Sequence, residues 1–504
     1  DSIRVLRLFS DVLAAAHSGS HFPGLGLPRA ARLPMLAALH QDLDAPILLL
    51  TDRADRALEF ADELGFWLGK PSNYLFPEPN PLFYEEAAWG SNSRRERIQT
   101  LTVLAAYHLP LAQKPVSPPV IVSSARALMA RTLPRRDFLK ASKRLSTGDE
   151  VLLNSLLENW LRIGYEPVNT VLETGQFSHR GGLLDIWPPA EKSPLRLDFF
   201  GNEIDTIRRF DPASQRTIEK LDQLLITPAR EYLLPQTLDS EKEFSEFHIP
   251  LFHTFPASLL DYLPAHSLIL IDDLSMTTST VNEIEEQALA FRQESIQEEI
   301  LDADFPVPYL TWSELEDSLH GRPKLELGYS TASAEMPSDF GALPRFNGRL
   351  KPFMDYVAER ITSNDEVIIA SRQSDRLSEL WRERHAFENS EYLSPIFLHT
   401  SLSGGWSLSP PAPAELPPRE RGGLRGGIFL LTDSEIFGWE RPRLRRRARK
   451  TADAPEAAYA DLSSGDWVVH IDHGIGRFAG LKQRALDGYD REFLCIEYKD
   501  ADQL

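Results

Sequence analysis

The sequence predicts an α/β assembly of several domains, in which helix-covered parallel sheets alternate with smaller, sheet-rich domains. Three observations lead to this fold class. Short apolar runs closed by polar residues alternate with helical periodicity, which is typical of buried parallel strands and their covering helices. Residues 150–230 change to period-two alternation, which indicates an antiparallel sheet. At 504 residues the chain is too long for one hydrophobic core.

The first α/β segment covers residues 11–130. Residues 45–52 and 120–124 are apolar runs that end in polar residues, and apolar side chains recur at helical spacing over residues 58–64. A strand, a helix and a second strand of the same sheet are therefore predicted here.

Two further α/β segments follow the period-two stretch. In 231–345, residues 267–273 form an apolar strand that ends in Asp272 and Asp273, and the acidic stretch 281–299 is predicted to be a helix. A third α/β unit has predicted strands at 366–370 and 427–433. Between them, residues 404–427 are rich in Pro and Gly, which predicts a poorly ordered surface loop.

The period-two stretch contains a predicted hairpin. Leu195, Leu197 and Phe199 would face one side of a strand, and Arg196, Asp198 and Phe200 the other. Gly201 and Asn202 follow as a tight connection to the next strand. Short strands resume after residue 465, where Val468, Ile471, Ile475 and Phe478 are predicted to be the core of an incomplete small β-barrel.

These patterns predict a domain order. One α/β domain is built in two parts, 1–130 and 231–345, and an α+β domain over 131–230 is inserted into it. A third α/β domain (346–445), a linker (446–461) and a truncated β domain (462–504) follow. The basic run from Arg441 to Lys450 is either part of a solvated linker or an arm that contacts phosphates.

Composition limits the function classes. The formal charge of −20 opposes tight DNA binding through the surface as a whole, because phosphate neutralisation needs Lys and Arg. The single cysteine, Cys495, excludes internal disulfides and cysteine-based zinc sites, and it predicts a reducing, cytoplasmic location. No apolar run is long enough for a membrane span, so no membrane partner is expected. His470 and His473 lack further ligands, so no metal site is predicted.

A working nucleotide site is not predicted either. The phosphate loop G-x-x-x-x-G-K-[ST] does not occur in the sequence. Its expected place holds Gly24, Gly26 and Arg29, without the lysine and hydroxyl that bind phosphates and Mg²⁺. Asp272 and Asp273 could end a metal-binding strand, but without the loop a cap or turn is the more common role. We expect a degenerate nucleotide fold with no catalytic residue and no cofactor.

Two segments resemble a known family. Residues 175–189, with 195–205, 209–212 and 215–216, closely resemble the domain shared by bacterial transcription–repair coupling factors and the excision-repair helicase UvrB. Residues 465–478 and 492–498 look like the RNA-polymerase-interacting domain of the coupling factors, which is similar to CarD-type and Tudor-like modules. UvrB lacks the second module, so the pair points to the N-terminal part of a coupling factor. The resemblance makes the first α/β domain a degenerate, UvrB-like relative of P-loop ATPases.

The resemblance also implies partners and sites. In that family the domain that carries the first of these two segments docks onto UvrA. The matching positions here are Arg180, Arg196, Asp198 and Phe200. Arg180 is expected on the strand next to Arg196, and Ser178 stands where UvrB carries an arginine, which predicts a differently balanced interface. A surface ion pair that holds the sheet is the alternative role for these charges.

The last module is expected to bind the β subunit of RNA polymerase, by extending a sheet across the boundary. Leu481, Arg484 and Leu486, near the turn signal Asp487–Gly488, are the predicted contacts. The family's ATP-driven translocase motor, with its ATP, Mg²⁺ and double-stranded DNA, is expected downstream of Leu504.

Two alternatives remain at this stage. An active UvrB-type helicase subunit would carry Lys-Ser/Thr after a glycine-rich loop near residue 30, where the sequence has Arg29-Ala30-Ala31-Arg32. A CarD-type transcription regulator would not need the roughly 400 residues that precede the last module.

Overall fold

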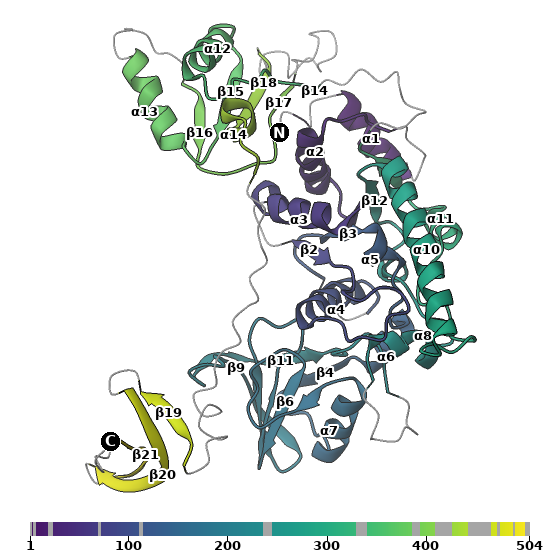
Figure 1. The fold of residues 1–504 in the computed structure, drawn as a ribbon, viewed down its shortest axis with the longest axis vertical. Coiled ribbons are helices and arrows are strands. Elements are labelled where there is room, and N and C mark those ends of the chain that lie inside the picture. Colours follow the sequence, from purple (N-terminus) through teal and green to yellow (C-terminus); the bar gives the residue numbers. More distant parts are fainter. Residues whose placement is uncertain are drawn as a thin grey trace. The chain divides into compact units, whose positions relative to one another are not determined.

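The computed structural model describes residue 3 and the segments 7–18, 24–68, 72–109, 114–234, 244–328, 340–385, 394–408, 426–441, 465–470, 474–486 and 489–498. It is a mixed α/β structure with several sheets (Figure 1). The chain forms two compact units. One comprises Asp1–Lys143, Arg162–Gly164 and Thr227–Ala448, and the other comprises Arg144–Leu161, Tyr165–Ile226 and Arg449–Leu504. Among the helices described, none is both long and apolar enough to cross a membrane.

The first unit contains a five-stranded parallel sheet. Its strands are β1 (Ile47–Thr51), β2 (Asn73–Phe76), β3 (Val120–Ser124), β12 (Leu268–Ile271) and β13 (Lys324–Glu326). They lie in the order β13-β12-β1-β3-β2. The strands predicted over 45–52, 120–124 and 267–273 are confirmed as β1, β3 and β12. All five residues of β1 are buried, as expected for a strand covered on both faces.

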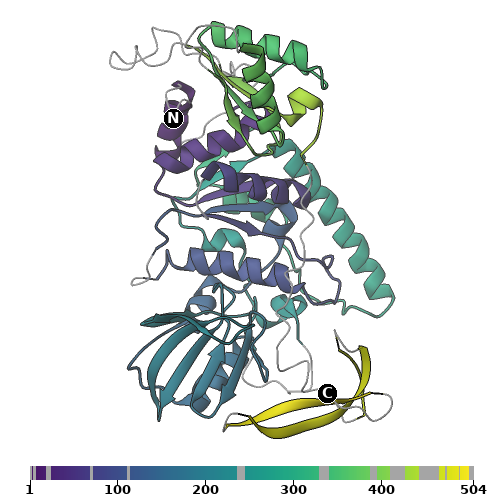
Figure 2. The same cartoon turned by 90° about the vertical axis from the view of Figure 1, so that its left-hand side faces the viewer.

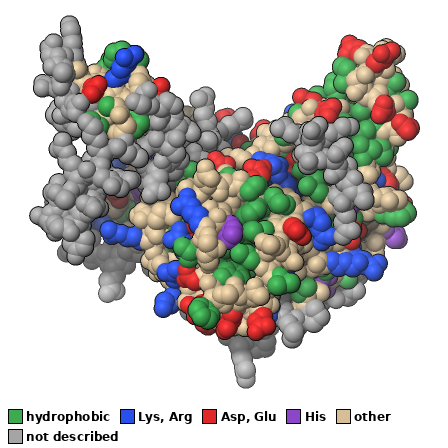
Figure 3. All heavy atoms as spheres, turned by 90° about the horizontal axis from the view of Figure 1, so that it is seen from below, with side chains coloured by type: hydrophobic (Ala, Val, Ile, Leu, Met, Phe, Trp, Pro, Cys, Tyr) green, Lys and Arg blue, Asp and Glu red, His purple; other side chains and the backbone are tan. Residues whose placement is uncertain are grey.

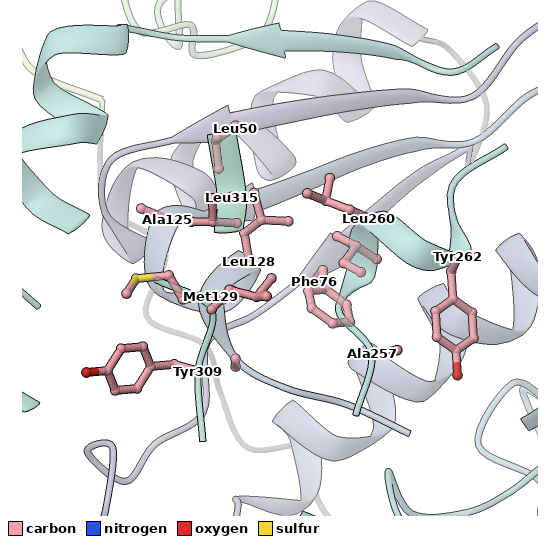
Figure 4. Packing of buried hydrophobic residues seen from close by; sticks show 14 of the residues in the cluster. Leu50, Phe76, Ala125, Leu128, Met129, Ala257, Leu260, Tyr262, Tyr309 and Leu315 are labelled. Carbon is pink, nitrogen blue, oxygen red and sulfur yellow. The ribbon is translucent and has the colours of Figure 1, made fainter. Parts of the chain in front are cut away.

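The helices of this part of the unit pack on the sheet or lie near it. They are α1 (Arg7–Ser18), α2 (Arg29–Asp42), α3 (Ala54–Leu68), α4 (Ser91–Ala105), α5 (Ala125–Met129), α6 (Arg135–Ala141), η2 (Glu246–His248), α8 (Ile249–Phe252), α9 (Leu259–Tyr262), α10 (Leu274–Gln297) and α11 (Trp312–Leu319). Side chains of β1 alternate between two apolar cores, because successive residues of a strand point to opposite faces. Leu48 and Leu50 join the core that includes Phe76 and Tyr262, shown in Figure 4, while Ile47 and Leu49 join the other.

The same unit contains a second, mixed sheet. Its elements are β14 (Phe340–Gly341), α12 (Leu350–Thr362), β15 (Glu366–Ala370), α13 (Ser374–His385), β16 (Ile396–Leu398), β17 (Trp406–Leu408), β18 (Ile428–Thr432) and α14 (Asp433–Phe437), with strand order β14-β17-β18-β15-β16. The prediction of a loop over 404–427 is wrong at its start. Residues 406–408 form β17, which pairs with β18, and the side chains of Trp406 and Leu408 are buried. Residues 409–425 lie outside the described segments.

The second unit contains a six-stranded sheet. The strands are β5 (Glu166–Pro167), β6 (Gln176–Arg180), β7 (Leu183–Ile186), β8 (Leu195–Phe200), β9 (Glu203–Phe210) and β10 (Thr217–Leu221), side by side in the order β10-β9-β8-β7-β6-β5 (Figure 2). A short pair, β4 (Lys143–Ser146) and β11 (Gln223–Ile226), accompanies it. The inner face is apolar, and Trp160 of α7 (Leu153–Arg162) meets Phe177 of β6 edge to face at 5.6 Å.

The predicted hairpin is confirmed between β8 and β9. Phe200 pairs with Glu203, and Gly201 takes a positive φ of 65°, which a glycine adopts without strain. The pairing shifts between Asp198 and Phe199, where one extra residue of β9 makes a bulge.

The last described elements form a three-stranded antiparallel sheet. Its strands are β19 (Trp467–His470), β20 (Gly474–Leu486) and β21 (Tyr489–Glu497). Phe478 and Cys495 are buried, but Ile475 is 67% exposed, so its predicted place in the core is wrong. Residues three apart in a strand point to opposite faces, so Ile475 and Phe478 cannot share one core. Ile471 lies outside the described residues.

Candidate protein-docking site

The outer face of the six-stranded sheet carries the predicted docking residues. Residues paired across neighbouring strands point to the same side of a sheet. Asp185 of β7, Arg196 of β8 and Arg208 of β9 stand in one such row. Asp198 stands in the next row, so this face carries alternating charges rather than a block of one sign.

Arg196 is held by its neighbours on this face. Its Nε and Nη2 donate to the two carboxylate oxygens of Asp185 at 2.7 and 2.8 Å, and Nη2 also donates to Gln215 Oε1 at 2.9 Å. The guanidinium lies 4.5 Å from the ring centre of Phe210. Hydrogen bonding to Asp185 raises the pKa of Arg196. Such a two-pronged pair fixes the orientation of the arginine fork.

Asp198 is likewise engaged within the sheet. Its Oδ2 accepts from Arg208 Nη2 at 2.5 Å and from the hydroxyl of Thr206. The sequence left open that these charged residues form ion pairs that hold the sheet, and Arg196 and Asp198 both form such ion pairs.

Arg180 has different partners from those of Arg196 and Asp198. It is the last residue of β6, is exposed, and donates through Nη2 to the Asn169 carbonyl and to Thr170 Oγ1, the latter at 3.1 Å. No carboxylate of the described chain forms an ion pair with it. The prediction that Arg180 lies on the strand next to Arg196 is wrong, because β7 runs between β6 and β8.

Arg180 and Arg196 both line a hollow of about 430 Å³. It is lined by Asn169, Thr170, Ser178, Arg180, Leu183, Asp185, Arg196, Ala213, Ser214 and Gln215. Leu183 is 40% exposed and adds an apolar surface to an otherwise polar lining. Asp198 and Phe200 do not line the hollow. Phe200 is 83% exposed at the end of β8, a degree of exposure that is unusual for so large an apolar side chain.

Sequence reasoning missed several residues of this hollow. Asn169 and Thr170 lie before β6, and Ser214 and Gln215 lie in the turn between β9 and β10. The turn signal Asp211-Pro212 could have located Ser214 and Gln215. The order of the strands, which the sequence does not show, brings this turn and the segment before β6 to the same hollow. The surface seen from below shows hydrophobic side chains between Lys and Arg side chains (Figure 3).

In the predicted nucleotide region, arginines bind the buried carboxylate of Asp272. Arg32 Nη1 donates to Asp272 Oδ1 at 2.5 Å and to its carbonyl at 3.0 Å, and Arg56 Nε donates to Oδ2. Arg32 and Asp272 are both at most 5% exposed. Their charges compensate each other, as buried ionised groups require.

The other predicted residues of this region have structural positions. Gly26 takes a positive φ of 61° and donates its N–H to the Gly328 carbonyl at 3.0 Å, and Gly24 beside it is buried. Arg29 is the exposed first residue of α2. Asp273 caps α10 by accepting from Met276 N–H at 3.0 Å, which is the cap role that the sequence suggested.

The predicted polymerase contacts lie on β20. Leu481, Arg484 and Leu486 pair with Leu494, Arg491 and Tyr489 of β21. The predicted turn residues Asp487 and Gly488 lie outside the described segments. In the part of the chain that is described, no group of three or more His, Cys, Asp or Glu could hold a metal ion.

Two domain families match this chain. Residues 144–232 match the UvrB interaction domain, and residues 462–504 match the CarD-like/TRCF RID domain. The first match covers the sheet that carries the hollow, and the second covers β19 to β21.

Similar proteins cover nearly the whole chain. Transcription-repair-coupling factors are 28% identical in Myxococcus xanthus, 24% in Bacillus subtilis strain 168 and 22% in Staphylococcus aureus strain MRSA252, over 99%, 98% and 95% of this chain. The chain spans less than half of their length, 46%, 45% and 44% respectively. Together, these relatives and the two domain matches fit the N-terminal part of a transcription-repair-coupling factor.

Proposed function

We propose that this chain is a recruitment module that binds UvrA through the outer face of β6 to β9 and RNA polymerase through the sheet β19 to β21. The observation that supports the proposal is the hollow that both Arg180 and the hydrogen-bonded guanidinium of Arg196 line. The similarity to the UvrB interaction domain and to coupling factors supports UvrA as the protein bound there.

The docking face has the composition of an interaction surface. Arg180 offers a guanidinium without a carboxylate partner in the described chain, and arginine is enriched among residues that dominate binding energy. Leu183 and Phe200 add exposed apolar surface to this face. We infer that an acidic side chain of UvrA pairs with Arg180, while the Arg196–Asp185 pair keeps the wall of the hollow rigid.

The first test removes the exposed ring of Phe200. We expect Phe200→Ala to weaken UvrA binding by roughly tenfold, since truncating an interface anchor costs about 1–2 kcal/mol. The free energy of unfolding should stay unchanged, because the ring is 83% exposed. Isothermal titration with purified UvrA measures the effect. Ile218→Ala, an exposed apolar change on β10, is the matched control; equal affinities for the two variants would reject Phe200 as a contact.

We further propose that the first sheet hydrolyses no nucleotide and that this chain needs no cofactor. Arg32 and Arg56 occupy the carboxylate of Asp272 that a magnesium ion would need, and the phosphate loop is missing from the sequence. ATP and Mg²⁺ belong, on this proposal, to a motor elsewhere in the intact protein, which also contacts double-stranded DNA. We also propose that the protein is located in the cytoplasm.

The second test is an ATPase measurement. Phosphate release from ATP and Mg²⁺ by the purified chain should equal the rate without protein, because Arg32 and Arg56 already engage the carboxylate of Asp272. Turnover that is abolished by Asp272→Asn would contradict the proposal directly. Turnover that survives this change would indicate a contaminating enzyme.

The third test removes the last module. Deleting residues 462–504 should abolish binding to RNA polymerase and leave UvrA affinity within about twofold. We propose the β subunit as the partner, bound by addition of a strand to the open edge of β19 or β21. Surface-immobilised β subunit measures this binding. Unchanged capture of the shortened chain would place the polymerase contact elsewhere.

A further inference from the structure

The outer face of the six-stranded sheet ends in two carboxylates that the backbone holds side by side. Glu150 and Glu203 face each other across an isolated antiparallel bridge. The hydrogen bonds that flank this bridge run from Val151 N–H to the Asn202 carbonyl at 2.7 Å and from Ile204 N–H to the Asp149 carbonyl at 3.0 Å. This pattern makes Glu150 and Glu203 a non-hydrogen-bonded pair. Such pairs have the closest side chains in a sheet, because their Cα atoms are only about 4.5 Å apart.

No cation of the described chain neutralises this pair. Glu150 and Glu203 are both exposed, and neither side chain forms an ion pair or a hydrogen bond with a described residue. Arg180 is too distant to help, because three strand spacings, roughly 14 Å, separate β6 from β9. Salt screens exposed charges over about 8 Å at physiological ionic strength. Like charges directly opposite each other destabilise a sheet, so the fold leaves a repulsion here without compensation.

The register of the strands places this pair next to Phe200. Residues paired across strands point to the same side of a sheet. One row on the outer face consists of Arg180, Leu183, Asp198 and Thr206, and the row at the end consists of Phe200, Glu203 and Glu150. The bulge does not turn Phe200 inward, because its extra residue lies on β9. From β6 to the segment beside β9, this end of the face therefore runs from a cation through exposed apolar side chains to two carboxylates.

We propose that the Glu150–Glu203 pair is a second anchor of the docking surface and receives a basic side chain of UvrA beside Phe200. The proposal rests on the proposed function, in which UvrA binds this face. A guanidinium or ammonium group between the two carboxylates would replace their repulsion by attraction, and guanidinium is the better fit because it can bind both.

The same arrangement would fix how UvrA is oriented on the sheet. An acidic group of UvrA meets Arg180 at one end, and a basic group meets Glu150 and Glu203 at the other. Leu183 and Phe200 supply the apolar contact between them. A partner turned by half a revolution would oppose like charges at both ends, which is strongly unfavourable in an interface.

The experiment removes the two charges and measures stability and binding separately. In the double variant Glu150→Gln with Glu203→Gln, the midpoint of thermal unfolding should stay the same or rise, because the repulsion is gone. The affinity for UvrA should fall by about five- to tenfold, because an ion pair of the interface is lost. Circular dichroism measures the unfolding of the whole chain, and isothermal titration measures the binding of purified UvrA.

Single variants test the sign of the charge. Glu203→Lys should weaken UvrA binding by at least about tenfold, since it repels a basic group, although it creates an ion pair with Glu150 inside the chain. Glu203→Asp keeps the charge and should bind within about threefold of the unaltered chain. Glu158→Lys is the matched control, because it makes the same charge change at an exposed position of α7, which packs on the inner face.

The outcomes separate this inference from the proposed function. If the double variant and Glu203→Lys bind UvrA as tightly as the unaltered chain while Arg180→Glu loses binding, the docking face stands and the second anchor is wrong. If neither Arg180→Glu nor the Glu203 variants weaken binding, UvrA binds elsewhere and both proposals fail. A double variant that loses binding together with thermal stability would show a structural role for the pair and would also overturn the inference.

Discussion

Reversing the charge at Arg180 should weaken the binding of UvrA by about a hundredfold or more, which is the loss expected when a dominant arginine of an interface is replaced by a repelling group. Arg180→Glu would place a carboxylate in the hollow next to Asp185. An acidic side chain of UvrA would then meet two negative charges instead of a guanidinium. Isothermal titration with purified UvrA measures the effect.

Arg180 separates binding from folding better than Arg196 does. Arg180 is exposed and bonds only to Asn169 and Thr170 in the described structure, so its replacement should change the free energy of unfolding little. Arg196→Glu would instead oppose Asp185 across the sheet and lose the bonds at 2.7 and 2.8 Å. A loss of UvrA binding in that variant would mix a missing contact with a disturbed sheet.

The matched control is Lys220→Glu, which makes the same change of charge on the exposed edge strand β10, outside the hollow. It should retain UvrA affinity within about twofold at physiological salt, because Lys220 does not line the hollow and exposed charges are weakened by salt. If Arg180→Glu and Lys220→Glu bind equally well, the assignment of the hollow as the docking site is wrong.

The largest loss of stability is expected from breaking the ion pair between Arg97 and Glu231. Arg97→Met should lower the free energy of unfolding of the first unit by about 3–5 kcal/mol, the usual cost of leaving one buried charge unpaired. Both side chains are at most 1% exposed. Nε and Nη2 of Arg97 donate to the two oxygens of Glu231 at 2.6 and 2.9 Å.

Aromatic rings and a backbone carbonyl complete the surroundings of Arg97. Its guanidinium lies between the rings of Phe76 and Trp89, with centroids at 3.9 and 4.7 Å, and Nη1 donates to the Pro77 carbonyl at 3.0 Å. Water has no access to this site. The fork geometry also predicts that Arg97→Lys recovers only part of the stability, because an ammonium cannot make the two-pronged pair.

Urea unfolding followed by circular dichroism measures these changes. The double variant Arg97→Met with Glu231→Leu should lose less stability than either single variant, since it removes both charges together. Arg209→Met, which removes two partly exposed ion pairs with Glu191 and Glu219, should cost clearly less, because such pairs contribute about 0–1 kcal/mol each. If Arg97→Met and Arg209→Met lower the free energy of unfolding equally, burial does not make the Arg97–Glu231 pair more stabilising than an exposed pair.

The sequence predicted the local elements well, because these depend on short-range patterns. The all-apolar runs became the buried strands β1, β3 and β12, and the alternation over 195–200 with Gly201-Asn202 became the β8–β9 hairpin. Errors arose where composition alone did not predict burial. Trp406 and Leu408 form a strand inside a stretch otherwise rich in Pro and Gly, and Ile475 faces solvent although it is apolar.

By itself, the sequence determined which chemical groups are present: no phosphate loop, one cysteine, and arginines on the alternating strands beside Phe200. Only the tertiary structure decided which of these groups are paired with another residue. Arg196 is bound by Asp185 of the adjacent strand, and Arg32 is bound by Asp272, 240 residues further along the chain. Arg180 lacks such a carboxylate within the described chain. These partners depend on strand order and packing between distant segments, which no local pattern of residues encodes.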